Sequence, residues 1–207
     1  LSSTQAVTVS VADVAPAIIS GAAGGVTEGA AAGTTVYTAA ASDVAGGTVS
    51  YSLSGTDAGS FSISSSTGVV TINAIPDYEA KSSYSINVVA SDGTLSSTQA
   101  VTVSVADVAP AISSGAAGSV AEGAAAGTTV YTAAASDVAG GTVTYSLSGT
   151  DAGFFTINSS TGVVTINAIP DYETKSSYSL SVVASDGTLS SAQAVTVSVT
   201  DVAPAIS

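Results

Sequence analysis

Apolar and polar residues alternate one by one along most of this chain. In TVSYSLS (48–54) the apolar positions are Val49, Tyr51 and Leu53, with serine or threonine between them. The same two-residue period runs through SYSINVVA (83–90) and VTVSV (101–105). Successive side chains of a β-strand point to opposite faces of the sheet, so this period predicts strands buried on one face. No stretch shows the 3.6-residue period of an amphipathic helix.

Glycine-containing clusters separate the alternating stretches. They include SGTDAG (54–59), SSSTG (64–68) and SDGT (91–94), which are typical turn sequences. The alanine-rich stretch 30–41 contains six alanines, the residue with the highest helix propensity. Its internal glycine, adjacent threonines and Val-Tyr pair favour a strand instead.

The whole pattern repeats with a period of 94 residues. The sequence AVTVSVADVAPAI occupies 6–18 and 100–112, and AVTVSVTDVAPAI occupies 194–206. Residues 17–110 and 111–204 differ at only 12 positions. Likeness at this level indicates recent duplication within a tandem array.

The period defines the expected domains. We expect the last strand of a preceding repeat at 1–14, full repeats at 15–108 and 109–202, and the start of a following repeat at 203–207. Because Leu1 falls inside the pattern, we expect the chain to be a piece of a longer array. Roughly seven strands per repeat and no helix predict an all-β fold, namely tandem Ig-like, Greek-key β-sandwiches.

The composition excludes several classes of function. The chain has 15 acidic and two basic residues, a net charge of −13, so it repels nucleic acid and attracts cations. It has no cysteine and no histidine, which excludes disulfides, thiol-bound zinc and the commonest groups of acid–base and nucleophilic catalysis. No run of 18 apolar residues occurs, so we expect no membrane insertion. We expect the protein not to be an enzyme.

The acidic residues gather at strand ends and turns. Each repeat has seven of them in the same order, and Lys81 and Lys175 are the only basic residues. Clustered carboxylates repel one another, and a hard divalent cation with about six to eight oxygen ligands relieves that repulsion. Asp57 and Asp151 lie in the two SGTDAG turns, where we expect turn or cap residues. The two lysines are expected to be solvated in polar loops.

Five motifs in a fixed order resemble a known family. They are VTEG (26–29), FSISSSTGVVTI (61–72), PDYE (76–79), VVASDG (88–93) and VTVSVADVAP (101–110). Together they look like the consensus of cadherin-type repeats, and more closely like the cadherin-like (dystroglycan-type) repeats of large bacterial surface adhesins. The resemblance covers the whole 94-residue repeat, twice. It implies cadherin-like sandwiches with Ca²⁺ bound at the junction between consecutive repeats.

The resemblance also implies which carboxylates bind the ion. The junction between the two full repeats would use Glu28, Asp77, Glu79, Asp107, Asp137 and Asp186. The preceding junction would use Asp13, Asp43 and Asp92 with acids of a repeat outside this sequence. The following junction would use Glu122, Asp171, Glu173 and Asp201.

The chain departs from the family pattern in two of these loops. The family linker usually carries a run such as Asp-x-Asn-Asp-Asn before its proline, whereas ADVAP keeps only Asp107. The loop that often reads Asp-Ala-Asp is DVAGG (137–141), where Ala139 and Gly141 offer no side-chain oxygen. Fewer ligands imply one or two ions per junction and weak binding, with a dissociation constant of roughly 0.1–1 mM.

These observations predict a structural role outside the cell. We expect a calcium-rigidified stalk repeat of a long extracellular bacterial adhesin or surface filament. Its partners would be neighbouring repeats of the same chain and, in a filament, other copies. Two alternatives stay open. One is a ligand-binding module for carbohydrate or for homophilic cell adhesion, and the other is a filament subunit that assembles by strand complementation through residues 1–14.

Overall fold

The computed structural model describes residues 1–44 and 46–204, so most of the segment 203–207, expected to be the start of a following repeat, lies outside the described residues. The chain divides into two compact units. The first unit consists of Leu1–Val26, Ala30–Pro76 and Lys81–Val105. The second unit consists of Thr27–Gly29, Asp77–Ala80 and the chain from Ala106 onward. Two short loops that the 94-residue period assigns to the first repeat thus belong to the second unit.

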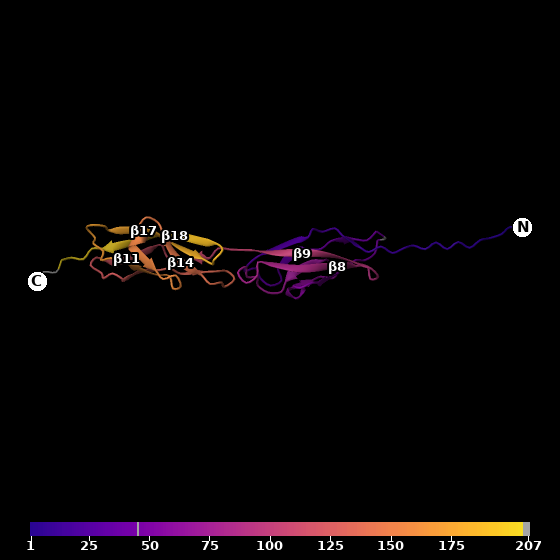
Figure 1. The fold of residues 1–207 in the computed structure, drawn as a ribbon, viewed down its shortest axis with the longest axis horizontal. Helices are drawn as coiled ribbons and strands as arrows, with labels where there is room; N and C mark the ends of the chain where they lie inside the picture. Colours follow the sequence, from indigo (N-terminus) through magenta and orange to yellow (C-terminus); the bar gives the residue numbers. More distant parts are fainter. Residues whose placement is uncertain (45, 205–207) are drawn as a thin grey trace. The chain divides into compact units, whose positions relative to one another are not determined.

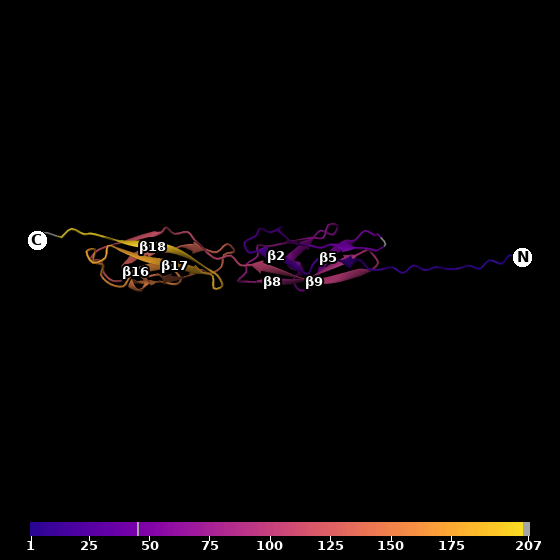
Figure 2. The ribbon, with the colours of Figure 1, turned by 90° about the horizontal axis from the view of Figure 1, so that it is seen from above.

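Both repeats fold into the same series of strands (Figures 1 and 2). The strands of the first repeat are β1 (Ala17–Ile18), β2 (Ala23–Thr27), β3 (Thr35–Thr38), β4 (Ala41–Ser42), β5 (Ser50–Ser54), β6 (Phe61–Ile63), β7 (Val69–Ile72), β8 (Ser83–Ser91) and β9 (Ser96–Ala106). Those of the second are β10 (Ala111–Ile112), β11 (Ala117–Ala121), β12 (Thr129–Thr132), β13 (Ala135–Ser136), β14 (Thr144–Ser148), β15 (Phe155–Ile157), β16 (Val163–Ile166), β17 (Ser177–Ser185) and β18 (Ser190–Thr200).

Each repeat is a sandwich of a four-stranded and a three-stranded sheet. The first repeat has the strand orders β2-β9-β8-β5 and β3-β7-β6, and the second has β11-β18-β17-β14 and β12-β16-β15. The long strands β17 and β18 lie side by side and antiparallel, whereas β11 pairs with β18 in parallel. The all-β prediction is confirmed. The described residues of each repeat form nine strands rather than about seven, because β1 with β4, and β10 with β13, add pairs of strands too short to show a period.

In the part of the chain that the structure describes, helical structure is confined to two 3₁₀ turns, η1 (Ala58–Ser60) and η2 (Ala152–Phe154). The alanine-rich stretch 30–41 contains β3 and the start of β4, so its prediction as a strand is confirmed. The described residues contain no helix with the length and hydropathy needed to cross a membrane.

Alternation along the strands places every second side chain in the core. In β9, Val101, Val103 and Val105 are 1%, 0% and 4% exposed, while the residues between them face solvent. The same hexamer, AVTVSV, begins at residue 6, where its three valines are 79–93% exposed and no strand is formed. No strand of the described chain pairs with this segment. The expected last strand of a preceding repeat at 1–14 therefore stays a prediction.

The two sheets of a sandwich approach each other closely where β11 passes β12. A Cβ atom at Gly118 would lie 2.6 Å from the carbonyl oxygen of Val130. Gly24 stands in the same relation to Val36 in the first repeat, also at 2.6 Å. Real Cβ atoms do not approach a backbone oxygen this closely, so glycine is required at both positions by packing.

Candidate metal centre

Four of the six predicted ligands of the central junction directly follow the end of a strand, and the other two lie in the loop before β8. Glu28 comes directly after β2, Asp107 after β9 and Asp186 after β17. Asp137 follows β13, and the 77–80 loop precedes β8. The loops that carry these residues belong to the second compact unit, and the strands fix where each loop begins. Strand ends therefore bring to one place residues that are far apart in the sequence.

Glu28 is the best-fixed member of this group. It is 3% exposed, and its Oε1 accepts a hydrogen bond from the backbone N–H of Val108 at 2.7 Å. Its Oε2 accepts one from the backbone N–H of Tyr78 at 3.0 Å. A buried carboxylate with both oxygens bonded to backbone donors cannot change rotamer without losing these bonds. Glu28 thus holds the 77–80 loop and the segment after β9 together.

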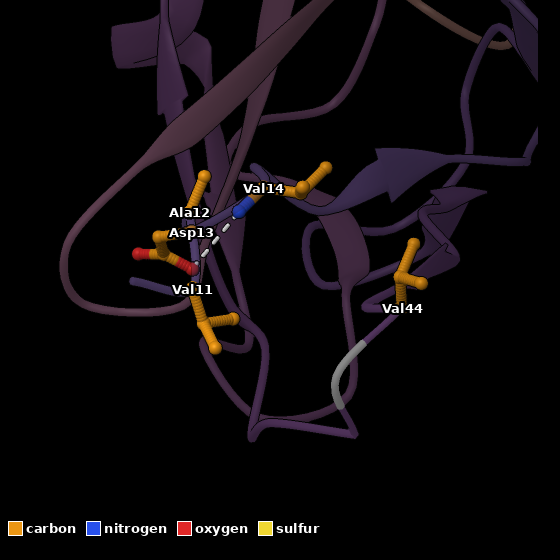
Figure 3. A pocket seen from close by; sticks show the side chains of 5 residues that line it. All are labelled: Val11, Ala12, Asp13, Val14 and Val44. Atoms are coloured by element: carbon orange, nitrogen blue, oxygen red, sulfur yellow. Dashed lines mark hydrogen bonds between the residues drawn. The ribbon is translucent and has the colours of Figure 1, made fainter. Parts of the chain in front are cut away.

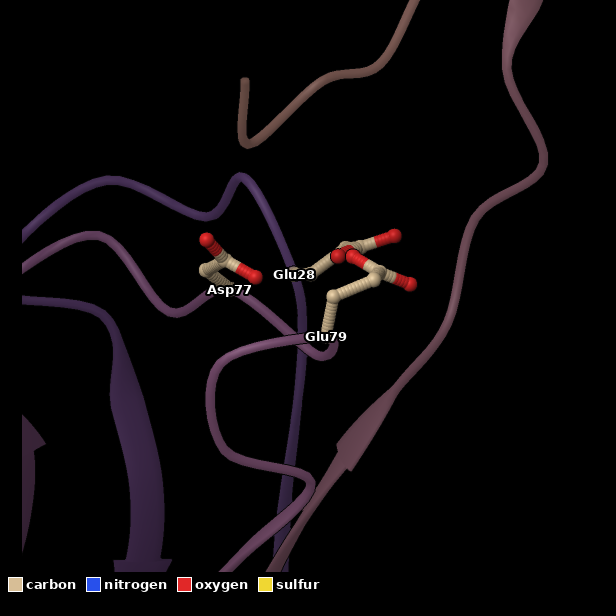
Figure 4. Close-up of side chains that lie close together, drawn as sticks. All are labelled: Glu28, Asp77 and Glu79. Carbon is tan, nitrogen blue, oxygen red and sulfur yellow. The ribbon is translucent and has the colours of Figure 1, made fainter. Parts of the chain in front are cut away.

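Six carboxylates gather around this point. The ligand oxygens of Glu28, Asp77 and Glu79 lie within 4.8 Å of one another, and Figure 4 shows the three side chains close together. A second group, Glu79, Asp107 and Asp186, meets the same limit and shares Glu79. A Cβ atom at Gly141 would lie 3.6 Å from both Glu79 Oε2 and Asp137 Cγ, so Asp137 borders the cluster. We call these residues the six-carboxylate cluster: Glu28, Asp77, Glu79, Asp107, Asp137 and Asp186.

Four oxygens of this cluster are buried without any hydrogen-bond donor among the described residues. They are both carboxylate oxygens of Asp107 and the Oδ2 atoms of Asp137 and Asp186. Buried polar atoms are nearly always paired, because an unpaired one has lost water and gained nothing in return. Oxygen is the ligand atom that Ca²⁺ and Mg²⁺ prefer, and a cation would satisfy all four atoms at once. The residues present therefore fit a hard divalent cation.

Loss of hydration and mutual repulsion raise the pKa of two carboxyl groups in the cluster. Loss of hydration raises the pKa of Asp107, and the charges of Asp186 and Glu28 raise it further. Glu79 is exposed as a residue, yet desolvation of its carboxyl raises its pKa as well. The charges of Glu28, Asp107 and Asp137 act in the same direction. The charged form of both carboxyl groups is therefore less stable than that of an isolated carboxylate, as expected where positive charge is lacking.

A smaller group occupies the equivalent position after β11. The ligand oxygens of Glu122, Asp171 and Glu173 also lie within 4.8 Å of one another. Glu122 repeats the bonds of Glu28, accepting from the backbone N–H groups of Val202 at 2.8 Å and Tyr172 at 3.3 Å. Asp201, the fourth predicted member, is exposed and is in none of the three-carboxylate groups of the described chain.

The three residues predicted for the preceding junction stay a prediction. Asp13, Asp43 and Asp92 belong to none of the three-carboxylate groups formed by described residues. Asp13 is exposed in a shallow hollow beside Val11, Val14 and Val44, and its Oδ1 accepts from the N–H of Val14 at 3.0 Å (Figure 3). Asp92 Oδ1 accepts from the backbone N–H groups of Leu95 and Thr94, which lower its pKa, while its Oδ2 is buried without a donor among described residues.

Asp57 lies at the turn and cap position expected from the sequence, and Lys81 lies exposed in a polar loop, but the two side chains pair with each other. Asp57 occupies the N-cap position of η1 but makes no side-chain cap bond. Its Oδ1 pairs with Lys81 Nζ, and its Oδ2 accepts from the backbone N–H of Ser85 at 2.7 Å. Asp151 does the same with Lys175, at 2.6 Å. A charged partner in the loop before β8 or β17, together with a backbone N–H of that strand, takes the place of the turn amides. One signal in the sequence could have indicated these ion pairs: each repeat has a single lysine, and the lysine and this aspartate recur together with the 94-residue period.

A model of the cadherin domain matches residues 23–106 and 116–200. Among curated proteins, the chain is similar to Protocadherin Fat 4 of mouse, with 37% identity over 147 residues, and of human, with 36% identity. The match covers 66% of this chain and only 3% of each relative's length. Both are animal proteins, so they give no support to the bacterial origin expected from the sequence.

The fold has counterparts among solved structures. Human Protocadherin-24 EC1-2 (Form II) has 23% sequence identity and a TM-score of 0.50. The match covers 91% of this chain and 100% of that chain. Sequence identity at this level shows the fold alone, and the shared fold is the cadherin β-sandwich.

Proposed function

Since the chain belongs to the cadherin family, we propose that it is a calcium-stiffened spacer in the extracellular part of a long protein. The family consists of extracellular repeats that act in adhesion and generally bind Ca²⁺ between repeats. The single observation that carries the calcium assignment is the set of buried, unpaired oxygens of Asp107, Asp137 and Asp186. A bacterial adhesin or surface filament remains a prediction of the sequence within this proposal.

Two subsites account for the six-carboxylate cluster. Glu28, Asp77 and Glu79 would hold one cation, and Glu79, Asp107 and Asp186 a second, with Asp137 beside it. Glu79 would bridge them. Bound calcium supplies positive charge that cancels the repulsion among these carboxylates. Because Glu28, Asp77 and Glu79 come from one repeat of the sequence and Asp137 and Asp186 from the next, binding would restrict their relative motion.

The same ligand set argues against catalysis. The clusters recur with the period of the repeat, as expected for a structural joint. The chain contains no cysteine or histidine that would act as nucleophile or base. We therefore propose a mechanical role and no enzymatic one.

Calcium-dependent stability and rigidity test the proposal. In 10 mM Ca²⁺, a site with a dissociation constant of roughly 0.1–1 mM adds about 1.4–2.7 kcal/mol, which raises Tm by about 3–10 °C over the value in chelator. Small-angle scattering should show a longer, better-defined maximum dimension with calcium. If Tm and the maximum dimension were the same in calcium and in chelator, the proposed function as a calcium-stiffened spacer would be wrong.

One observation favours a second candidate, association of copies through residues 1–14. The exposed valines Val7, Val9 and Val11 belong to a hexamer that is buried as part of β9 and β18. A copy of this repeat whose own last strand is displaced offers the matching surface. Light scattering over a hundredfold concentration range should then show association that Val9→Asp abolishes. A monomer at every concentration contradicts it. Carbohydrate binding and homophilic contact remain open alternatives, and no feature of the described chain favours either.

A further inference from the structure

Lys175, the only basic residue in the sequence of the second repeat, forms an ion pair with Asp151. Lys175 Nζ lies 2.6 Å from Asp151 Oδ1, and the backbone N–H of Ser179 donates to Asp151 Oδ2 at 2.7 Å. Asp151 is 7% exposed. The ammonium also lies 5.0 Å from the centre of the Tyr178 ring, within the range of a cation–π contact. Lys175 is thus held by the charge of Asp151, which Ser179 of β17 fixes in turn, and by an aromatic face.

Lys175 also terminates the loop that presents two predicted ligands. Its backbone N–H donates to the carbonyl oxygen of Asp171 at 3.0 Å, closing the loop. The residue before it, Thr174, donates its N–H to Asp171 Oδ1 at 3.1 Å and its hydroxyl to Oδ2 at 2.8 Å. A continuous series of bonds therefore runs from Asp151 through Lys175 to the carboxylate of Asp171.

The ion pair also keeps the ammonium group of Lys175 next to Asp151 and away from the predicted ligands. Lys175 is two residues from Glu173 in a very acidic chain, and a free ammonium there would compete with a metal ion for carboxylates. Asp151 is not among the predicted ligands, and it holds that ammonium. Glu122, Asp171 and Glu173 accordingly keep their negative charge for a cation.

We propose that Asp151 and Lys175 are positioning residues for the calcium loop 171–173. They anchor the end of the loop to the core and keep the lysine away from the ligands. This rests on the proposed calcium function and extends it to residues that do not contact the ion. Partners that orient metal ligands from outside the first coordination shell typically change affinity by about 10–100-fold when removed.

The first repeat contains a matched pair. Lys81 Nζ bonds Asp57 Oδ1, the N–H of Ser85 donates to Asp57 Oδ2 at 2.7 Å, and the ammonium lies 4.9 Å from the centre of the Tyr84 ring. Lys81 follows the 77–80 loop directly in the sequence. Asp57 and Lys81 are therefore assigned the same role toward Asp77 and Glu79.

Two backbone amides report on the two sites separately. The N–H of Tyr172 is bonded to Glu122, and that of Tyr78 to Glu28. Calcium titrations of the ¹⁵N-labelled chain, followed at these two amides, give one dissociation constant for each site. We expect Asp151→Asn to raise the constant seen at Tyr172 about tenfold and to leave the one at Tyr78 within about twofold. Asp57→Asn should do the reverse, so each variant is the control for the other.

A purely structural role makes a different prediction. If Asp151→Asn lowers Tm but leaves both dissociation constants unchanged, the positioning role is wrong. Should that variant fail to fold, Lys175→Gln and Lys175→Arg decide the question. Arginine still pairs with Asp151, so it should retain the affinity at Tyr172 that glutamine loses, and equal constants for the two variants would overturn the proposal. Absence of any calcium-induced shift in the unmodified chain would instead refute the calcium function itself, and the positioning role with it.

Discussion

Glu28 Oε1 accepts a 2.7 Å hydrogen bond from the backbone N–H of Val108, a residue 80 positions further along the chain. The bond places the Glu28 carboxylate beside Asp107, the residue immediately before Val108. Glu122 repeats the arrangement with Val202, where the neighbouring Asp201 is exposed. Among the described residues, Asp107 belongs to a group of three carboxylates and Asp201 to none, although the two linkers are chemically alike.

Asp107 and Asp201 should respond differently to loss of their charge. In chelator, Asp107→Asn should raise Tm, because it removes a desolvated negative charge that faces Asp186 and Glu28. In calcium the same variant should lose most of the metal-dependent gain in Tm. Asp201→Asn is the matched control and should leave both values nearly unchanged. A fall in Tm for Asp107→Asn in chelator would contradict this account of the cluster.

Acid should weaken the two aspartate–lysine pairs. The Lys81 ammonium and the Ser85 N–H lower the pKa of Asp57, and Lys175 and Ser179 lower that of Asp151. Their stabilisation is therefore complete above the unfolded pKa of about 3.9 and disappears as pH falls through the lower folded values.

Urea unfolding in chelator from pH 6 to pH 2 can check this expectation. The difference in stability between the unmodified chain and the Asp57→Asn/Asp151→Asn variant should be constant down to about pH 4 and then shrink. A difference that persists unchanged to pH 2 would show that the ion pairs are not its origin.

The repeated hexamer allows one substitution to be compared in two environments. Val103→Ala should cost about 1.5–3 kcal/mol of unfolding free energy, because Val103 is fully buried in β9. Val9→Ala removes the same atoms from the same local sequence at 82% exposure and should change stability by less than about 0.5 kcal/mol. Equal effects in chemical denaturation would mean that residues 6–11 are buried in solution.

Gly118 should be intolerant of even one methyl group. Gly118→Ala would place a Cβ 2.6 Å from the Val130 carbonyl and should cost about 1–3 kcal/mol in denaturant unfolding. Gly115 has no atom within 4 Å of its virtual Cβ, so Gly115→Ala is the control and should be nearly neutral. A neutral Gly118→Ala variant would indicate that the two sheets separate without cost.

Local features were predictable and long-range pairings were not. The two-residue period identifies the long strands such as β8 and β9, because side-chain alternation is a property of a single strand. Two-residue strands such as β1 carry no such signal. The family resemblance nominated all six carboxylates of the cluster, and they lie together, although their binding of calcium stays a prediction.

The sequence could not show which oxygens lack a donor or what Asp57 bonds to. Both depend on segments that approach only in the folded chain. Asp57 and Lys81 are 24 residues apart with turns and strands between them, so a turn role was the natural local interpretation. The N-cap position was correct, but the partner of the side chain is chosen by tertiary contacts.

The strands β9 and β18 share the hexamer AVTVSV, and each completes its sandwich with the same three buried valines. During refolding, either strand therefore meets two sandwiches that accept it almost equally well. Exchange of an identical element between neighbours is the characteristic misassembly of tandem repeats. Near-identity of sequence, which makes such an array easy to lengthen by duplication, thus carries a kinetic cost each time the chain folds.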